Sequence, residues 1–104
     1  ILRKSAQLAK ACVRKDDVLA RFGGEEFVAV MPDSDKRAAT EVAERIRKSI
    51  SEYEFEFERT AVRTTVSLGV ATIHQGLKSH VDLLDDADRK LYVSKQSGRN
   101  RVTA

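Results

Sequence analysis

Apolar residues recur every three or four positions in three stretches of the chain, which is the spacing of an amphipathic helix. The stretches are residues 1–15, residues 36–51 and the segment between Ser79 and Gly98. Ser79 is at the position of a helix N-cap, and Gly98 is at the position of a C-cap glycine. The first stretch begins inside its pattern, with no capping residue ahead of it. The stripes predicted to be buried are Leu2, Ala6, Ala9 and Val13 in the first helix, Ala39, Val42, Ala43, Ile46 and Ile50 in the second, and Val81, Leu84, Ala87 and Leu91 in the third.

Shorter apolar runs between these helices predict strands. Residues 18–22 and 27–31 are nearly continuous apolar runs, as in strands that are covered on both faces. The Gly23-Gly24 pair between them can adopt the positive φ values of a tight hairpin turn. Aromatic residues alternate with glutamates over residues 52–58, which predicts a half-exposed edge strand or hairpin arm with a solvated glutamate face.

Two further strands complete the pattern. Residues 62–73 predict a long strand with Val66, Leu68 and Val70 on one face, and residues 101–103 predict a short final strand. The order helix, strand, strand, helix, strand, helix, strand is typical of an α/β domain. We expect one domain over residues 1–104, with a central, mostly antiparallel sheet flanked by helices.

Composition narrows the classes of function. Hydrophobic residues make up 41% of the chain and charged residues 34%, which is typical of a soluble globular domain. The net charge is +3, and positive charge predominates only over residues 90–101, away from most aromatic residues. An anionic small ligand therefore fits this charge at least as well as a nucleic-acid polymer does. We do not expect a nucleic-acid polymer as a partner. Cys12 is the sole cysteine, which excludes an internal disulfide and favours a cytoplasmic location. No apolar run approaches the length of a membrane span.

The candidate chemistry lies in residues 21–27, where a glycine turn is followed directly by two carboxylates. Gly23 and Gly24 would let the backbone come close to a phosphate chain. Glu25 and Glu26 offer hard oxygen ligands to Mg²⁺ (or Mn²⁺), which often shares its coordination with substrate phosphates. The alternative is a common hairpin turn with two solvated glutamates, and the residues alone favour it.

Four segments, in order, resemble the GGDEF family of diguanylate cyclases. Gly23-Gly24-Glu25-Glu26-Phe27 resembles the motif that names the family, and residues 14–17 (Arg-Lys-Asp-Asp) resemble its RxxD product-inhibition site. Residues 65–71 are similar to its TxSxGVA strand, and residues 87–100 to its closing ADxALYxAKxxGRN segment. The resemblance implies a nucleotidyl cyclase-like fold with a ferredoxin-like βαββαβ core. It also implies condensation of two GTP into cyclic di-GMP by a homodimer, with an upstream sensor or receiver domain in the parent protein.

The resemblance further implies roles for single residues of the turn. Glu25 would be a metal ligand and the base that acts on the attacking 3′-hydroxyl, and Glu26 would support the metal or phosphate region less directly. Gly23 and Gly24 would wrap the nucleotide.

At the basic end of the chain, Lys95 and Arg99 would contact the terminal phosphates of the nucleotide, as the resemblance implies. Their alternative is a basic helix end that the helix dipole stabilises.

A second predicted site consists of Arg14, Asp17 and Arg45, which match the residues of the family's product-inhibition site. An arginine can bond a guanine at O6 and N7, and a nearby carboxylate can orient that arginine. The alternative is an exposed ion pair between Arg14 and Asp17, worth about 1 kcal/mol or less.

Two histidines and one tyrosine are predicted to have structural positions and no chemical role. His74 and His80 match no motif and are predicted to be surface histidines. Tyr92 is predicted to pack in the core or against a neighbouring helix.

The resemblance also implies that family segments precede Ile1. The family domain opens with a strand that carries a metal-binding aspartate, followed by Phe-Lys and Asn-Asp segments that hold guanine. Without this first strand and helix, the chain would be the C-terminal two-thirds of the domain, with strand edges unpaired. A membrane anchor would also fit in that region. The alternative function is a catalytically inactive module that binds cyclic di-GMP or a protein partner.

We predict that the 104-residue chain alone makes no cyclic di-GMP from GTP and Mg²⁺, because a metal ligand and the guanine contacts would be absent. A turnover assay that follows product by chromatography tests this. Steady product formation by the isolated chain would contradict the expectation.

Overall fold

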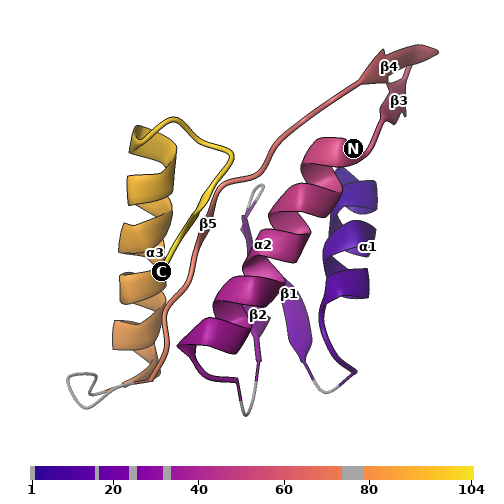
Figure 1. Ribbon diagram of the computed structural model, residues 1–104. Coiled ribbons are helices and arrows are strands. Elements are labelled where there is room, and N and C mark those ends of the chain that lie inside the picture. The colour runs from indigo at the N-terminus through magenta and orange to yellow at the C-terminus, as the bar shows by residue number, and fades with distance from the viewer. Residues whose placement is uncertain (1, 16, 24–25, 32–33, 74–78) are drawn as a thin grey trace.

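The elements follow the predicted order except that three short strands lie between the second and third helices, where the predicted order has one, and the α/β class is confirmed. The structure is a computed structural model that describes residues 2–15, 17–23, 26–31, 34–73 and 79–104, with the backbone alone at residues 2, 19–23 and 26. Helix α2 lies between α1 and α3 in Figure 1. The elements are α1 (Leu2–Cys12), β1 (Val18–Gly23), β2 (Glu26–Val30), α2 (Lys36–Glu52), β3 (Phe55–Phe57), β4 (Thr60–Val62), β5 (Leu68–Gly69), α3 (His80–Gln96) and β6 (Val102–Thr103).

Helix α2 supplies the centre of the core. It begins after Asp35, whose carboxylate accepts a hydrogen bond from the backbone N–H of Ala38 at 2.8 Å. Part of its buried stripe packs with Ala9 of α1 and with Phe55, and the rest packs with Val70. All five predicted positions of the stripe are buried: Ala39, Val42, Ala43, Ile46 and Ile50.

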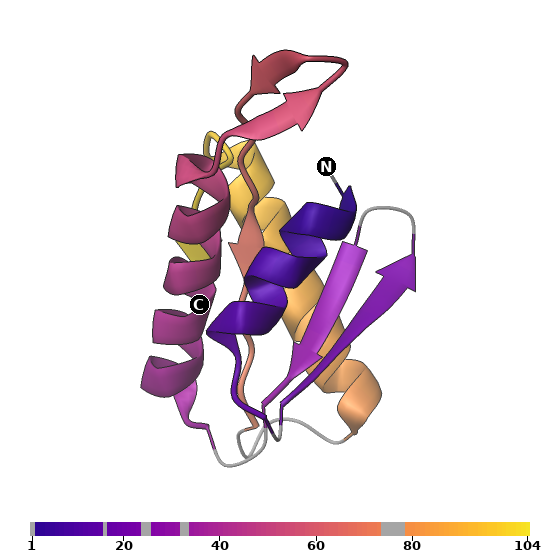
Figure 2. The same ribbon diagram turned by 90° about the vertical axis from the view of Figure 1, so that its right-hand side faces the viewer.

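The described strands form three two-stranded pairs. Strands β1 and β2 make an antiparallel hairpin in which Val18 lies opposite Val30 and Gly23 lies opposite Glu26. Strands β3 and β4 make a second antiparallel hairpin, which projects beyond the helices (Figures 1 and 2). Strands β5 and β6 are parallel and bring the end of the chain beside α3.

The prediction that residues 18–22 and 27–31 are covered on both faces is wrong at the open end of the hairpin. Val18 is 57% exposed and Val30 is 56% exposed. These two residues pair with each other, and no third described strand pairs with β1 or β2. A strand pair without neighbours leaves its edges open to solvent.

The strand predicted over residues 62–73 is largely replaced by backbone without strand pairing. Strand assignment requires a hydrogen-bonded neighbour, and β5 finds one only where β6 runs beside it among the described residues. There the backbone N–H of Val70 donates to the carbonyl of Thr103 at 2.8 Å. The predicted face is confirmed, since Val66, Leu68 and Val70 all contact the core.

The alternating segment at residues 52–58 forms the predicted hairpin arm with an exposed glutamate face. Phe55 is buried and meets the ring of Tyr53 edge-on at a centroid distance of 4.7 Å. Phe57 lies on the same side of the strand but is exposed, because the arm extends past the core.

Both predicted caps of α3 are confirmed. The Ser79 hydroxyl accepts a hydrogen bond from the backbone N–H of Asp82 at 3.3 Å. Gly98 follows the helix with φ of +119°, a left-handed conformation that favours glycine.

The inner stripe of α3 is only half as predicted. The backbone at Ala87 and Leu91 lies against Gly69, but Val81 and Leu84 are exposed. The prediction that Tyr92 packs inside is also wrong, because its side chain is 63% exposed. Strands β5 and β6 are the described elements that α3 contacts most, and both lie on the same side of it in Figure 1.

Ser94 is the residue of α3 that the hydrophobic pattern missed. Its side chain is fully buried, donates to the carbonyl of Leu68 at 2.8 Å and shares a hydrogen bond with Thr103 Oγ1 at 2.6 Å. One hydroxyl therefore holds the helix to both strands of the parallel pair.

Helix lengths otherwise differ little from prediction. Helix α1 ends at Cys12 instead of residue 15, because the chain turns there and the Asp17 carboxylate accepts the backbone N–H of Arg14. Among the described residues, none of the helices combines the length and apolar character needed to cross a bilayer.

Replacement of Gly69 by alanine tests the contact between β5 and α3. A methyl group there would overlap the backbone at Ala87 and Leu91, which cannot rotate away. We expect a loss of about 3 kcal/mol in the free energy of unfolding, measured with urea. The exposed control Ala61→Ser, which also adds one heavy atom, should change the stability by less than about 0.5 kcal/mol. Equal stabilities of the two variants would contradict the close approach.

Candidate functional site

The diglycine turn joins the ends of β1 and β2. Gly23 pairs with Glu26, and the register shifts between Arg21 and Gly23, so the hairpin is irregular just before its turn. Gly24 and Glu25 lie outside the described residues, and Glu26 is described by its backbone alone. Their predicted roles in metal and nucleotide binding therefore stay predictions. The described side chains elsewhere hold no group of three or more His, Cys, Asp or Glu that could bind a metal ion.

The basic end of α3 carries the predicted phosphate contacts. Lys95 lies half-buried in the last turn of the helix, and Arg99 lies exposed just beyond it. The backbone N–H of Arg99 donates to the carbonyl of Ser94 at 2.9 Å, which is the bond that closes a Schellman motif around Gly98. Both views place this end of α3 toward the same end of the molecule as the close of β1 and the start of β2 (Figures 1 and 2).

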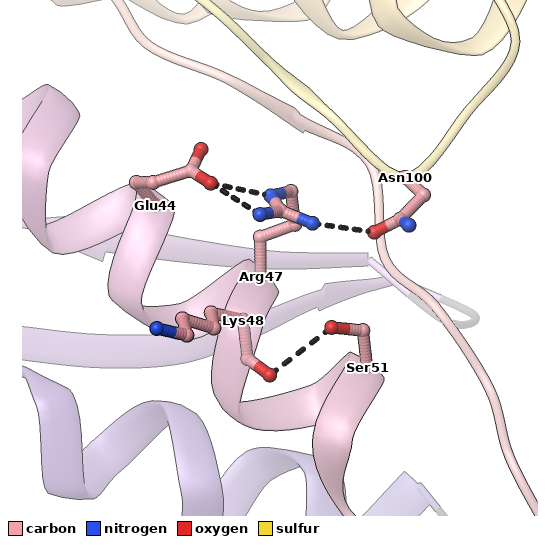
Figure 3. A network of polar contacts seen from close by, with 5 residues as sticks. All are labelled: Glu44, Arg47, Lys48, Ser51 and Asn100. Carbon is pink, nitrogen blue, oxygen red and sulfur yellow. Dashed lines mark hydrogen bonds and ion pairs between the residues drawn. The ribbon is translucent and has the colours of Figure 1, made fainter.

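The loop after α3 is held by a polar network that the sequence did not reveal (Figure 3). Arg47 Nη1 on α2 donates to Asn100 Oδ1 at 3.0 Å, and the Asn100 backbone N–H donates to Ser67 Oγ at 3.1 Å. Arg47 also donates through Nε to Glu44 Oε1 at 2.7 Å, and Nη2 contacts the same oxygen. Arg47 and Asn100 are 53 positions apart, so no local pattern points to their contact.

The pKa values of Glu44 and Arg47 are both shifted toward the charged forms of their side chains. Hydrogen bonding from Arg47, aided by its positive charge, lowers the pKa of Glu44 below its ordinary value. The same bond raises the pKa of Arg47. Glu44 is therefore anionic at neutral pH and orients the guanidinium that reaches Asn100.

The predicted product-inhibition residues gather at the end of α1. The Asp17 carboxylate accepts the backbone N–H of Arg14 at 2.7 Å, and Arg14 Nε lies 4.0 Å from the same oxygen. Arg14 Nη2 donates to Ser34 Oγ. Arg45, on α2, reaches the carbonyl of Cys12 from its Nη2 at 3.5 Å. The structure thus brings Arg45 to the end of α1, although it lies 28 or more positions from Arg14 and Asp17 in the sequence. We call this group of three residues the corner at the end of α1.

The alternative of an exposed ion pair is wrong for Asp17, which is 3% exposed. A buried carboxylate that accepts a backbone N–H has a structural role whatever else it binds. Arg14 keeps an exposed side chain, with 61% of its area accessible, so its guanidinium is open to a ligand.

Neither histidine matches a motif of the predicted sites. His80 is exposed at the start of α3, as predicted. His74 lies outside the described residues.

Comparison with known proteins identifies the family. Residues 1–101 match the family described as "Diguanylate cyclase, GGDEF domain". The chain is 42% identical over 103 residues to diguanylate cyclase A of Treponema denticola, covering 99% of this chain and 28% of that protein. It is 41% identical over 105 residues to the response regulator PleD of Caulobacter vibrioides, covering 98% of this chain and 23% of that protein.

Solved structures agree with the sequence relatives. The active GGEEF domain of a diguanylate cyclase from Vibrio cholerae superposes with a TM-score of 0.90 at 31% identity, covering 98% of this chain and 64% of that one. The GGDEF domain of DgcB from Caulobacter crescentus, solved with c-di-GMP, superposes with a TM-score of 0.91 at 32% identity. The match covers 99% of this chain and 61% of that one. The chain thus spans less than a third of these two sequence relatives and less than two thirds of these solved domains. It belongs to the GGDEF family of diguanylate cyclases.

Replacement of Asp17 by alanine tests its structural role. The change leaves the Arg14 backbone N–H without its buried acceptor, so we expect a loss of about 1–2 kcal/mol in the free energy of unfolding. The control Glu41→Ala removes a carboxylate that is 66% exposed and pairs with Arg37, and it should change stability by less than about 0.5 kcal/mol. Urea denaturation monitored by circular dichroism compares the two. Equal midpoints would show that the bond to Arg14 does not stabilise the turn.

Proposed function

We propose that the protein carrying this chain condenses two GTP molecules into cyclic di-GMP in the cytoplasm. The observation that supports this most is the family match over residues 1–101, together with the intact Gly23-Gly24-Glu25-Glu26-Phe27 segment at the turn between β1 and β2. Cyclic di-GMP synthesis is the reaction for which the family is named. The basic last turn of α3, toward the same end of the molecule, fits a triphosphate.

Each residue of the turn has a chemical task in this proposal. Glu25 accepts the proton of the 3′-hydroxyl as that oxygen attacks the α-phosphorus of the second GTP and pyrophosphate leaves. Gly23 and Gly24 let the backbone approach the nucleotide, because neither carries a side chain. Glu25, supported by Glu26, would hold Mg²⁺, which when bound offsets the negative charge of the phosphates.

At the other side of the proposed site, Lys95 and Arg99 neutralise the terminal phosphates. Their ammonium and guanidinium groups stand at the C-terminal end of α3, where the helix dipole favours positive charge. An arginine can bind phosphate oxygens through two parallel hydrogen bonds.

Assembly follows from the stoichiometry of the reaction. One domain would hold one GTP, so two domains meet face to face and a homodimer is the active form. The relative PleD is a response regulator, and the diguanylate cyclase SiaD of Pseudomonas aeruginosa was solved with its activator SiaC. We propose that an upstream sensor or receiver domain likewise controls dimerisation in this protein.

Product inhibition is the second part of the proposal. Arg14 and Arg45 would bind the guanine edges and phosphates of cyclic di-GMP, while Asp17 holds the backbone at Arg14 in place. The grouping of these residues at the end of α1 supports this role. The same grouping favours one other candidate function, a catalytically inactive module that binds cyclic di-GMP, because the corner needs nothing from the diglycine turn.

A crossed pair of substitutions in the full-length protein separates the two sites. Glu25→Gln should lower turnover of GTP at least 100-fold and leave the affinity for cyclic di-GMP unchanged. Arg14→Ala should weaken cyclic di-GMP binding about tenfold or more, measured by calorimetry, and leave uninhibited turnover unchanged. The Arg14 backbone bond to Asp17 survives that change, so the fold is kept.

Arg37→Ala is the matched control, since Arg37 is an exposed arginine of α2 that pairs with Glu41 and has no proposed role in either site. Unchanged turnover in Glu25→Gln would remove the catalytic assignment. Absence of turnover in the unaltered protein, with cyclic di-GMP still bound, would favour the inactive module. Unchanged product affinity in Arg14→Ala would remove the inhibitory site.

A further inference from the structure

The loop that carries Arg99 has a backbone that needs external support. Three consecutive residues adopt positive φ: Gly98 at +119°, Arg99 at +63° and Asn100 at +46°. Glycine takes such values freely, but residues with a Cβ do so at an energetic cost unless their surroundings hold them. The direction in which Arg99 leaves the backbone depends on this conformation being kept.

Among the described residues, Arg99 is hydrogen-bonded through its backbone to partners at this end of the chain. Its N–H donates to the carbonyl of Ser94 at 2.9 Å, and its own carbonyl accepts from Arg101 Nε at 3.1 Å. Both partners are near in sequence and belong to the same end of the chain. They close the turn but do not tie it to the rest of the domain.

Asn100 supplies that tie from two sides. Its backbone N–H donates to Ser67 Oγ at 3.1 Å, and its side-chain Oδ1 accepts from Arg47 Nη1 at 3.0 Å. Ser67 comes just before β5, and Arg47 lies on α2, so Asn100 is bonded to two separate parts of the chain. Figure 3 shows the bond from Arg47. The residue that follows Arg99 is therefore the anchored one.

Arg47 is itself fixed before it reaches Asn100. Glu44, one turn earlier on α2, accepts from Nε and from Nη2, which leaves Nη1 to meet Asn100. The Arg47 side chain is 22% exposed, so it is more enclosed than Glu44 at 51%. A planar guanidinium bonded along two edges holds a defined direction, which a flexible ammonium would not.

We propose that Arg47 is a positioning residue for the nucleotide site, which acts by holding Asn100 and so presenting Arg99 to the terminal phosphates of GTP. The inference rests on the proposed phosphate contact of Arg99 and adds a residue of α2 that itself touches no nucleotide.

Backbone hydrogen exchange in the full-length protein tests the positioning step alone. Arg47→Ala should raise the exchange rate of the Asn100 amide at least tenfold, because Asn100 loses one of its two bonds to the rest of the domain, while the bond from the Leu68 N–H to the Arg101 carbonyl remains. Arg47→Lys should restore part of the protection, since an ammonium can bond Asn100 but not Glu44 along a second edge. The control Arg37→Ala breaks an exposed pair on the same helix and should leave this amide unchanged. Unchanged exchange in Arg47→Ala would overturn the proposal.

A double-mutant cycle with a non-hydrolysable GTP analogue and Mg²⁺ tests the consequence for binding. Arg47→Ala and Arg99→Ala should each weaken the affinity about tenfold, and the double variant should bind no more weakly than Arg99→Ala. Additive losses would overturn the positioning role, because they mean that Arg47 acts apart from Arg99. If Arg99→Ala binds normally, the proposed phosphate contact fails and this inference with it. Normal binding by Arg99→Ala alongside faster exchange in Arg47→Ala would identify a structural tie only.

Discussion

The burial of one stripe of α2 is the contact on which the rest of the described structure depends. Its apolar residues pack against α1 and Phe55 along one part and against Val70 along the other. Full burial of an aliphatic side chain stabilises a fold by roughly 1.5–3 kcal/mol, so a stripe of this kind outweighs the exposed ion pairs of the same helix. Because this packing fixes the position of α2, polar residues on the helix can bond distant parts of the chain. Arg45 reaches the end of α1, and Arg47 reaches the loop after α3.

A second constraint fixes α3 and the loop beyond it. Gly69 lets the backbone of β5 approach the helix backbone at Ala87 and Leu91, which no residue with a Cβ permits. Ser94 then bonds both strands of the parallel pair. The proposed phosphate-binding end of α3 is thus held by backbone packing and buried hydrogen bonds, while its charged side chains remain accessible. This division fits a site in which rigid elements present polar groups to a ligand.

The sequence predicted best what depends on neighbours along the chain. The stripe of α2, the caps at Ser79 and Gly98, and the pairing of β1 with β2 all follow from local spacing or local hydrogen bonds. Exposure on α3 was mispredicted at Val81 and Leu84, which follow the period of a buried stripe, and at Tyr92, which was expected to pack in the core or against a helix. The elements that α3 contacts most, β5 and β6, do not cover these three side chains.

The candidate sites divide in the same way. Motif resemblance located Arg14, Asp17 and Arg45, and the structure brings them to one corner. The motif resemblance did not predict the bond between Arg47 and Asn100, because that contact joins residues 53 positions apart and depends on how α2 lies against the loop. The positive φ values at Arg99 and Asn100 were equally hidden, since tertiary bonds hold them.

The central claim is that the diglycine turn and the basic end of α3 bind one nucleotide together. Paramagnetic broadening of backbone amide signals by Mn²⁺ with a non-hydrolysable GTP analogue measures this directly in the full-length protein. The account predicts that signals at Gly23, Glu26 and Arg99 broaden together, while those at Arg14 and Arg45 keep their widths. Broadening confined to the corner at the end of α1, or absent from Arg99, would contradict it.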